Sequence, residues 1–266
     1  MELKSSEKLA IKYHDIFDYP LTSKELYKWK SNKGITGITS IINKSGFYFI
    51  KNREEIIKKR LGNERCSRKK LILAKKTSRL LSKIPTVKFV GITGALAMNN
   101  ASKNSDIDLM IITKSGTLWL TRLFVYLLIV LFGIKTRKPK DKQQRDKLCL
   151  NMWLDENDFV WNRIDRNMYT AHEVLQIVPL VNKDKTYEKF LSANTWVFSY
   201  WPNASKIIKS EKLKNSSAKE RFLEYLAYKI QYWYMSKKIT REVVTPTRAI
   251  FHPNDWGKIV LQRTKN

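Results

Sequence analysis

The sequence predicts an α+β fold, in which a small mixed β-sheet is flanked by helices, with a winged-helix-like unit before it and a helical region after it. Three apolar, strand-like segments at residues 87–92, 107–113 and 148–154 predict the sheet. Helical spacing of apolar residues dominates after residue 166. The chain has 266 residues, 43% of them hydrophobic, so it can bury a sizeable core in one large or two modest domains.

Residues 1–65 are predicted to form the winged-helix-like domain. Apolar residues from Leu9 to Phe17 fall on one helical face, and Thr22–Glu25 is a capping box that opens a second helix. Residues 35–43 are expected to form a third helix, followed by a strand at residues 47–51. In a winged helix-turn-helix the third helix contacts nucleic acid. Packing against other parts of the protein is the alternative use of such a unit.

Three further regions follow this domain. Residues 66–84 are predicted to form a connecting helix, residues 85–165 the sheet-containing domain, and residues 166–266 a helical domain. The connecting region carries a basic face, which is typical of a solvated surface and, alternatively, of a binding site. The cations of this face are Arg65, Arg68, Lys69, Lys70, Lys75 and Lys76.

The apolar segment at residues 118–134 is interpreted as a helix buried against the sheet rather than as a membrane span. It falls short of the roughly 20 apolar residues that a span needs, and Arg122 lies within it. The basic run at residues 135–140 leaves association with a membrane surface open as the minority interpretation.

The formal net charge of +27 predicts attraction to polyanions such as nucleic acid, nucleotides or anionic membrane surfaces. A lysine-rich composition shared by a whole proteome would give the same charge without a specific partner. Cys66 and Cys149 lie far apart and form no Cys-x-x-Cys pair, which argues against a structural zinc site. These cysteines, and an N-terminus without the apolar core of a signal peptide, predict a cytoplasmic protein.

Asp106 and Asp108 are the strongest functional signal in the sequence. Residues i and i+2 of a strand project from the same face, so the two carboxylates are expected to lie together. Neighbouring negative charges repel unless a cation lies between them, and a divalent metal that also holds nucleotide phosphates is the usual solution. A polar turn that caps the strand without a metal is the alternative.

The stretch Thr93-Gly94-Ala95, ten intervening residues and then Asp106-Ile107-Asp108-Leu109 resembles the signature of the DNA polymerase β-like nucleotidyltransferase superfamily. The resemblance implies that residues 85–165 form a nucleotidyltransferase domain. It also implies that Asp106 and Asp108 bind Mg²⁺ or Mn²⁺, and that an NTP, expected to be ATP, donates its nucleotidyl group.

The same resemblance implies contacts to the phosphates of the nucleotide. The backbone N–H groups of Gly94 and Ala95 would cradle the phosphates, with a hydroxyl contact from Thr93. Lys103 or Arg122 would neutralise the charge that develops on the pyrophosphate leaving group.

The whole chain is also similar to bacterial nucleotidyltransferase-domain proteins of unassigned activity. The segments that carry this similarity are Phe17–Leu21, Leu148–Leu154, Tyr169–Glu173 and Phe251–Pro253. Within the third segment, His172 and Glu173 are interpreted as a hydrogen-bonding pair between helices rather than as catalytic groups.

Two residues depart from the superfamily pattern. Ala95 stands where Gly or Ser is expected, and Asn151 lies in the strand that would supply a third carboxylate. Asp155 shares the expected face of that strand, about 13 Å farther along. Two functions therefore remain open. One is transfer of NMP to a hydroxyl of RNA, a protein or a small molecule; the other is a catalytically degenerate protein that binds nucleic acid or senses nucleotides.

Overall fold

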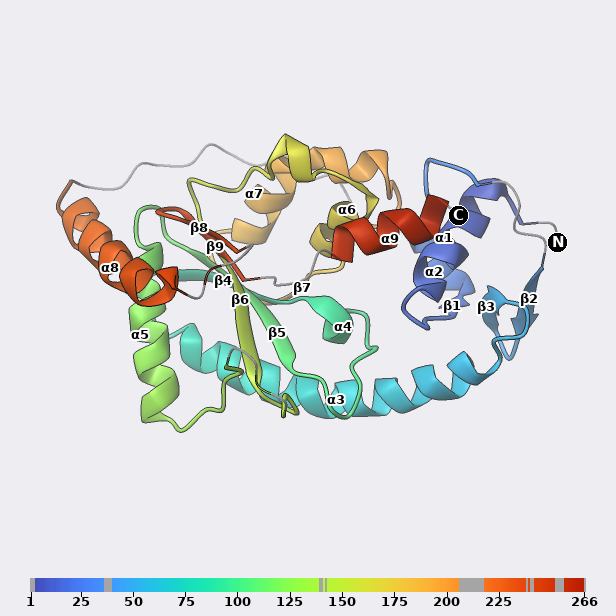
Figure 1. The fold of residues 1–266 in the computed structure, drawn as a ribbon, viewed down its shortest axis with the longest axis horizontal. Coiled ribbons are helices and arrows are strands. Elements are labelled where there is room, and N and C mark those ends of the chain that lie inside the picture. Colours follow the sequence, from blue (N-terminus) through green and yellow to red (C-terminus); the bar gives the residue numbers. More distant parts are fainter. Residues whose placement is uncertain are drawn as a thin grey trace.

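The computed structural model of the chain has the predicted α+β fold (Figure 1). Its described part contains a six-stranded mixed sheet and a separate three-stranded sheet. The described residues are 3–35, 40–138, 141, 143–205, 218–237, 239, 242–251 and 256–265.

The N-terminal unit combines two helices with the three-stranded sheet. Its elements are α1 (Ser5–Asp15), β1 (Leu21–Thr22), α2 (Ser23–Lys28), β2 (Ile41–Lys44) and β3 (Phe47–Ile50). The predicted capping box of α2 is present: the Thr22 hydroxyl accepts from the backbone N–H of Glu25, whose carboxylate accepts from the backbone N–H of Thr22. Strand β3 lies between β1 and β2.

The prediction of a third helix at residues 35–43 is wrong for residues 41–43, which the structure describes as strand. Residues 41–44 form β2, which pairs antiparallel with β3. Ser45 and Gly46 have φ angles of 55° and 79°, and two such residues in succession close a tight hairpin. The β-branched pair Ile41 and Ile42 also favours a strand. Residues 36–39 of the expected helix lie outside the described residues.

Helix α3 (Glu55–Leu81) has 27 residues and extends along both the N-terminal unit and the large sheet (Figure 1). At 1.5 Å per residue it is about 40 Å long. It passes without interruption through residues 65 and 66, between which the sequence suggested a domain boundary. Buried Arg60 donates from both terminal nitrogens to the Glu25 carboxylate at 2.8 Å, which fixes α2 on the long helix.

The three strands predicted from apolar segments are confirmed as β4 (Val87–Ile92), β5 (Ile107–Thr113) and β6 (Leu148–Asp155). A short helix, α4 (Gly94–Ala97), joins the antiparallel pair β4 and β5. Helix α5 (Leu118–Leu131) forms the crossover between β5 and β6, which are parallel. Six of the seven residues of β5 are buried, as expected for a central strand covered on both faces.

The C-terminal region is less helical than the sequence suggested, because three of its segments join the large sheet. These strands are β7 (Val178–Asn182), β8 (Val243–Thr245) and β9 (Arg248–Ile250). The helices are α6 (Met168–Leu175), α7 (Thr186–Ala193), α8 (Ala218–Ser236) and α9 (Trp256–Lys265), with 3₁₀ turns η1 (Arg163–Asp165) and η2 (Thr195–Ser199). The complete strand order is β7-β4-β5-β6-β9-β8. Pro179 lies in the edge strand β7, where a missing N–H is tolerated.

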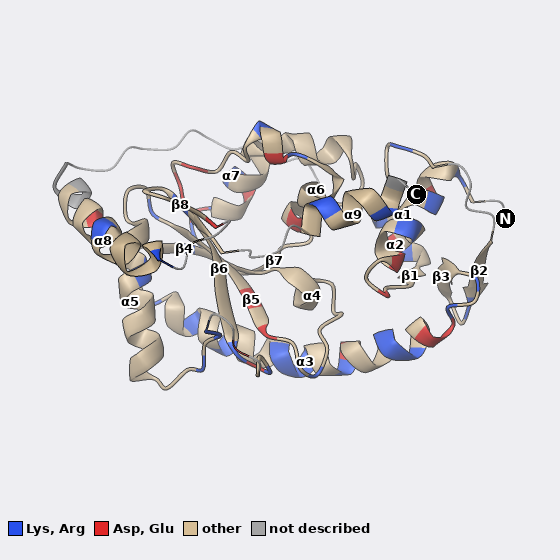
Figure 2. Ribbon diagram, in the orientation of Figure 1, with Lys and Arg blue, Asp and Glu red and all other residues tan. Residues whose placement is uncertain are grey.

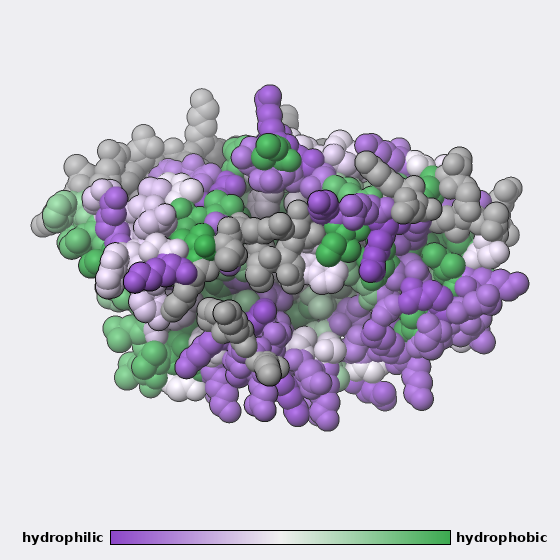
Figure 3. Space-filling model, in the orientation of Figure 1, coloured by the Kyte–Doolittle hydropathy of each residue, from purple (hydrophilic) through white to green (hydrophobic). Residues whose placement is uncertain are grey.

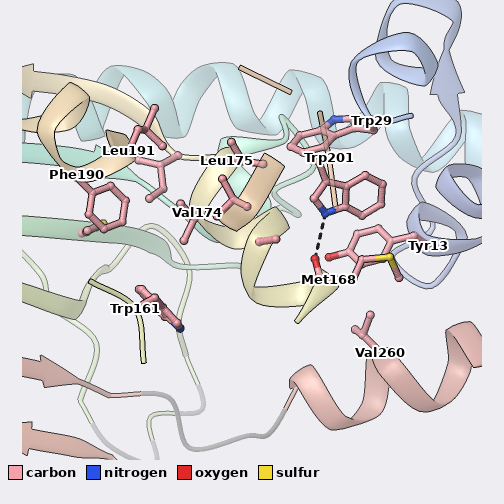
Figure 4. Close-up of a cluster of buried hydrophobic side chains, with 14 of the residues drawn as sticks. Tyr13, Trp29, Trp161, Met168, Val174, Leu175, Phe190, Leu191, Trp201 and Val260 are labelled. Atoms are coloured by element: carbon pink, nitrogen blue, oxygen red, sulfur yellow. Dashed lines mark hydrogen bonds between the residues drawn. The ribbon is translucent and has the colours of Figure 1, made fainter. Parts of the chain in front are cut away.

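Buried side chains form two clusters, one on each face of the large sheet. Alternate residues of β5 belong to different clusters: Met110 and Ile112 to one, Leu109 and Ile111 to the other. Figure 4 shows part of the first cluster, where aromatic and aliphatic side chains of α1, α6 and α9 meet. There the Trp201 indole N–H donates to the backbone oxygen of Met168 at 3.1 Å.

Helix α5 is only half buried, and its outer face joins that of α8 in an apolar surface (Figure 3). The sequence had suggested that this helix is covered by the sheet, yet Leu127 and Val130 are 62% and 75% exposed. On α8, Phe222 and Trp233 are 70% and 76% exposed. Among the residues that the structure describes, no helix has both the length and the apolar character that crossing a membrane requires.

Candidate active site

The two aspartates singled out in the sequence lie at the start of β5. Asp106 immediately precedes the strand and Asp108 is its second residue. In the parallel neighbour β6, Cys149 pairs with Asp108. One ligand atom from each of Asp106, Asp108 and Cys149 can be chosen so that all three lie within 4.8 Å of one another. The predicted juxtaposition of the carboxylates is therefore present.

Gly94 lies against the Asp108 carboxylate. A Cβ added at Gly94 would lie 2.8 Å from Asp108 Oδ2, and its φ of +60° is a conformation that L side chains rarely adopt. The backbone N–H of Thr93 donates to the backbone oxygen of Asp108 at 3.1 Å. The glycine turn thus holds Asp108 from the β4 side, and this close approach explains why no side chain is present at position 94.

Asn151 reaches Asp108 because of an irregularity in β6. The register shifts between the Asp108–Cys149 and Met110–Met152 pairs, so β6 has one more residue than β5 at this point. Such bulges re-aim side chains near functional sites. The Asn151 amide nitrogen donates to Asp108 Oδ1 at 2.7 Å, while its buried Oδ1 has no hydrogen-bond partner among the described residues.

Arg137 neutralises the other carboxylate. One of its terminal nitrogens lies 2.9 Å from Asp106 Oδ2 and 3.9 Å from the Cys149 sulfur. The sequence offered only its membership of the basic run at residues 135–140. What brings it to the site is the bridge between Thr136 and Leu148, which aligns the segment after α5 with β6.

The pKa of Asp108 is raised to about 7, chiefly by burial and also by the charge of Asp106. Hydrogen bonds from Cys149 and Asn151 and the charge of Arg137 act in the opposite direction without cancelling the rise. A divalent cation at the pair would favour the ionised carboxylate. Asp108 is thus a group whose protonation a bound metal would control.

Asp108 faces a cleft of about 480 Å³, a size typical of small-ligand sites. Thr93, Gly94 and Ala95 line it next to Asp108, together with Asn151. Opposite walls come from distant parts of the chain. They include residues 16–19 of the N-terminal unit, Tyr169 and Glu173 of α6, Phe251, and Trp256 of α9. At least one lining residue comes from each of the segments Phe17–Leu21, Leu148–Leu154, Tyr169–Glu173 and Phe251–Pro253, for which the sequence alone suggested a resemblance.

Glu173 is a cleft carboxylate that the sequence did not assign to the site. Its Oε1 accepts from the Gln176 amide at 2.6 Å, and both residues line the cleft. Burial raises the pKa of Glu173 to about 8, and the nearby charge of Asp108 contributes to the rise. Interhelical bonding instead involves its neighbour: the His172 and His14 rings meet at 3.2 Å between their Nε2 atoms, which links α6 to α1.

The remaining predicted site residues lie elsewhere. Asp155 is at the far end of β6, opposite Thr113, and its oxygens accept from the backbone N–H groups of Gly116, Thr117 and Asn157. It shapes the turn before α5 and does not line the cleft. Lys103 is exposed on the loop before β5.

Arg122 stabilises the packing of two helices. It donates to Gln231 of α8 at 2.6 Å and stacks over Trp119, Tyr126 and Phe251. Burial lowers the pKa of its guanidinium. Only its neighbour Phe251 belongs to the cleft, so Arg122 is one step removed from the candidate site.

The donor set at the aspartate pair fits a hard divalent cation such as Mg²⁺ or Mn²⁺. Asp106 and Asp108 supply carboxylate oxygens, and the unpartnered Oδ1 of Asn151 is an amide oxygen of the kind that such cations accept. Burial and the charge of Asp108 hold the pKa of the Cys149 thiol well above its usual range, so the sulfur stays protonated and hydrogen-bonds to Asp108. The carboxylate and amide oxygens are the kind of ligand that a hard cation prefers to a sulfur atom.

Comparison with known proteins found no family model that matches this chain and no curated protein that matches it.

Proposed function

We propose that the protein is a metal-dependent nucleotidyltransferase that transfers NMP from an NTP, with ATP as the expected donor, to a hydroxyl of an acceptor. The observation that supports this proposal most strongly is the contact between Gly94 and the Asp108 carboxylate, in a cleft that Asn151 also lines. In the sequence, the glycine turn and the aspartate pair were linked only by their spacing along the chain. Their direct contact gives that motif a physical purpose, because the turn positions a carboxylate that faces a ligand-sized cavity.

In the proposed reaction, the acceptor oxygen forms a bond to the α-phosphorus while the bond to the β-phosphate oxygen breaks and pyrophosphate leaves. Asp106 and Asp108 would hold the metal, with Asn151 Oδ1 as a neutral ligand. When bound, the metal neutralises phosphate charge and lowers the pKa of the attacking hydroxyl. Arg137 balances the charge of Asp106, and Thr93, Gly94 and Ala95 form the adjoining wall.

Glu173 would accept the proton of the acceptor hydroxyl. It takes over a task for which the strand offers no carboxylate, since Asn151 is an amide and Asp155 is bonded to backbone N–H groups elsewhere. A carboxylate whose pKa is about 8 is a stronger base than an ordinary glutamate, and it lies in the same cleft as Asp108. With the two aspartates, the Glu173 carboxylate of α6 gives the proposed site three carboxylates.

The test is transfer of label from α-³²P-ATP in the presence of Mg²⁺ or Mn²⁺, with total RNA and cell proteins as acceptors. Asp108→Asn is expected to reduce transfer by roughly a hundredfold or more, since a catalytic metal contributes several kcal/mol. Asp165→Asn is the matched control, because Asp165 is exposed and outside the cleft. Equal labelling by both variants would exclude the proposal.

A second function is favoured by one observation, the ion pair between Arg137 and Asp106 at 2.9 Å. The Arg137 guanidinium already neutralises the Asp106 carboxylate. This arrangement suits a protein that binds a nucleotide without catalysing its reaction. A regulatory nucleotide sensor of this kind would bind NTP in a metal-dependent manner in the same cleft. It would give no labelled acceptor in the transfer assay.

A further inference from the structure

Helix α3 has two faces of opposite character. Its inner face contains the buried residues Ser67, Lys70, Ala74 and Thr77. Its outer face carries exposed cations. Figure 2 shows that Lys and Arg positions, in blue, occur along most of the length of α3. These residues, called the α3 cations below, are Lys58, Arg65, Arg68, Lys69, Lys75, Lys76 and Arg79.

The α3 cations have no ion-pair partner within the part of the chain that the structure describes. Among the described residues, the ion pairs of this helix that involve its cations belong to Lys59, Arg60 and Lys70 instead. From residue 65 to residue 81 the sequence contains no Asp or Glu at all. Like charges three or four positions apart, such as Arg65 and Lys69, destabilise a helix. A surface helix selected for solubility alone would intersperse both signs of charge.

The opposite side of the same helix supports the approach to the aspartate pair. Asn63 donates to Asn100 at 2.8 Å, and Asn100 lines the cleft. Ser67 Oγ accepts from the backbone N–H of Ala101 at 3.0 Å. Lys70 donates to the backbone oxygen of Ser105 at 2.7 Å, one residue before Asp106. The α3 cations and the candidate active site therefore lie on two sides of one rigid element.

Two exposed cations extend the basic surface from α3 towards the site. Lys103 lies on the exposed loop whose backbone oxygen Lys70 contacts at 3.4 Å. Arg145 has a side chain that is 59% exposed, and it pairs at 3.3 Å with Asp146, the carboxylate that also pairs with Lys70. From Lys58 to Arg79 the helical stripe alone is about 32 Å long, which spans several successive phosphates of a nucleic-acid strand.

We propose that the α3 cations, continued by Lys103 and Arg145, bind the phosphate backbone of a nucleic-acid strand, and that this strand is the acceptor. The identity of the acceptor rests on the proposed nucleotidyl transfer, whereas the binding does not. An anionic membrane fits less well, because a helix that adsorbs to lipid needs an apolar face. On the outer face of α3 only Leu61 and Ile72 are large and exposed.

The test compares two variants with equal loss of charge. The first changes four α3 cations to Gln: Lys58, Arg65, Lys69 and Lys76. The matched control changes Lys24, Lys51, Arg163 and Lys185 to Gln, four exposed cations with no ion pair among the described residues and outside α3. Binding of fluorescein-labelled 20-nucleotide RNA and DNA strands is measured by anisotropy between 50 and 300 mM salt, without NTP or divalent metal.

The α3 variant is expected to lose affinity at least tenfold, and its slope of log Kobs against log salt should fall by about 3, that is by about 0.7 per lost phosphate contact. The control variant should stay close to the wild type. Similar losses in both variants, or in neither, would overturn the proposal. A preference for RNA over DNA would name the acceptor type. Transfer assays are run separately, so failure of nucleotidyl transfer leaves the binding result intact.

Discussion

The backbone at Gly94 lies so near the Asp108 carboxylate that no side chain fits between them. Gly94→Ala would place a methyl group 2.8 Å from Asp108 Oδ2 at a φ of +60°. We expect a loss of stability of about 1–2 kcal/mol from the backbone conformation, and in addition loss of metal-dependent nucleotide binding because the carboxylate must move. Urea unfolding and nucleotide titration measure the two effects.

Gly133→Ala is the control for that substitution. Its φ of +59° is almost the same, and a Cβ there would meet no atom within 4 Å. It should therefore lose a similar amount of stability while keeping nucleotide binding. Equal binding by both variants would show that the Gly94–Asp108 contact has no functional role.

Asn151 is the amide side chain that hydrogen-bonds to Asp108 in the candidate site. Asn151→Asp replaces a donor to Asp108, at 2.7 Å, by a repelling carboxylate. The metal-free variant should be less stable by about 2 kcal/mol, and Mn²⁺ should restore the loss because a third carboxylate strengthens the ligand set. Thermal unfolding with and without Mn²⁺ measures this, and a variant that Mn²⁺ stabilises no more than the wild type contradicts the placement of the metal.

Glu173 gives the protein a predictable pH dependence. The pKa of Glu173 is about 8 in the folded protein, against 4.5 in the unfolded chain. Its contribution to the free energy of unfolding is therefore complete below pH 4.5 and is lost as the pH rises through 8. Within this window each pH unit costs up to about 1.4 kcal/mol. Glu173→Gln should therefore gain stability relative to the wild type between pH 5 and pH 8.5, measured by urea unfolding without divalent ions.

The control is Glu55→Gln, because the Glu55 side chain is 70% exposed. Its stability difference from the wild type should not change over the same pH range. If the difference in free energy of unfolding between Glu173→Gln and the wild type is also independent of pH, the Glu173 carboxylate is solvated in the cleft.

Residue patterns anticipated this site in part. The i, i+2 spacing of Asp106 and Asp108 and the strands around them were sufficient to predict their juxtaposition, because strand geometry is local. Arg137, Glu173 and the bulge that turns Asn151 towards Asp108 were not predictable in this way. Each depends on contacts between segments distant in sequence, for which no short-range spacing exists.

Among the elements, α3 supports the loop before Asp106, and its buried Lys70 contributes to that support. Lys70 is 2% exposed, and its ammonium donates to Ser105 O and Asp146 Oδ1, both at 2.7 Å. Lys70→Met should cost about 2 kcal/mol of stability and reduce transfer, since the loop before Asp106 loses its support. Lys69→Met, on the exposed side of the same turn, should leave stability unchanged, as urea unfolding can show.

Elements with long, strongly periodic or apolar segments were predicted correctly, as β4, β5 and β6 show. Of the short elements, α2 and β3 were predicted but several others were not. Strands β8 and β9 have three residues each, too few to display alternation, and they form because β6 offers a free edge. Residues 41–43 of β2 were assigned to a helix, although the turn at Lys44–Gly46 was expected. Their pairing with β3 across that turn is a tertiary contact that the spacing of apolar residues does not display.

At the scale of the whole molecule, the cleft exists because the two ends of the chain close over the large sheet. Helix α9 contacts both α1 and α6, and Val260 of α9 is fully buried among their side chains (Figure 4). Asp108, the α6 carboxylate and residues of the N-terminal unit thereby line one cavity. No single predicted domain contains the site, which explains why its walls could not be inferred from any one segment.

The central claim is that Asp106 and Asp108 hold a divalent metal together with a nucleotide. Electron paramagnetic resonance of Mn²⁺, titrated with the protein in the presence and absence of ATP, measures this directly. The account predicts bound Mn²⁺ whose affinity rises with ATP in the wild type and in Asp165→Asn, and its loss in Asp106→Asn/Asp108→Asn. Mn²⁺ binding that is unchanged in the double variant would contradict the claim.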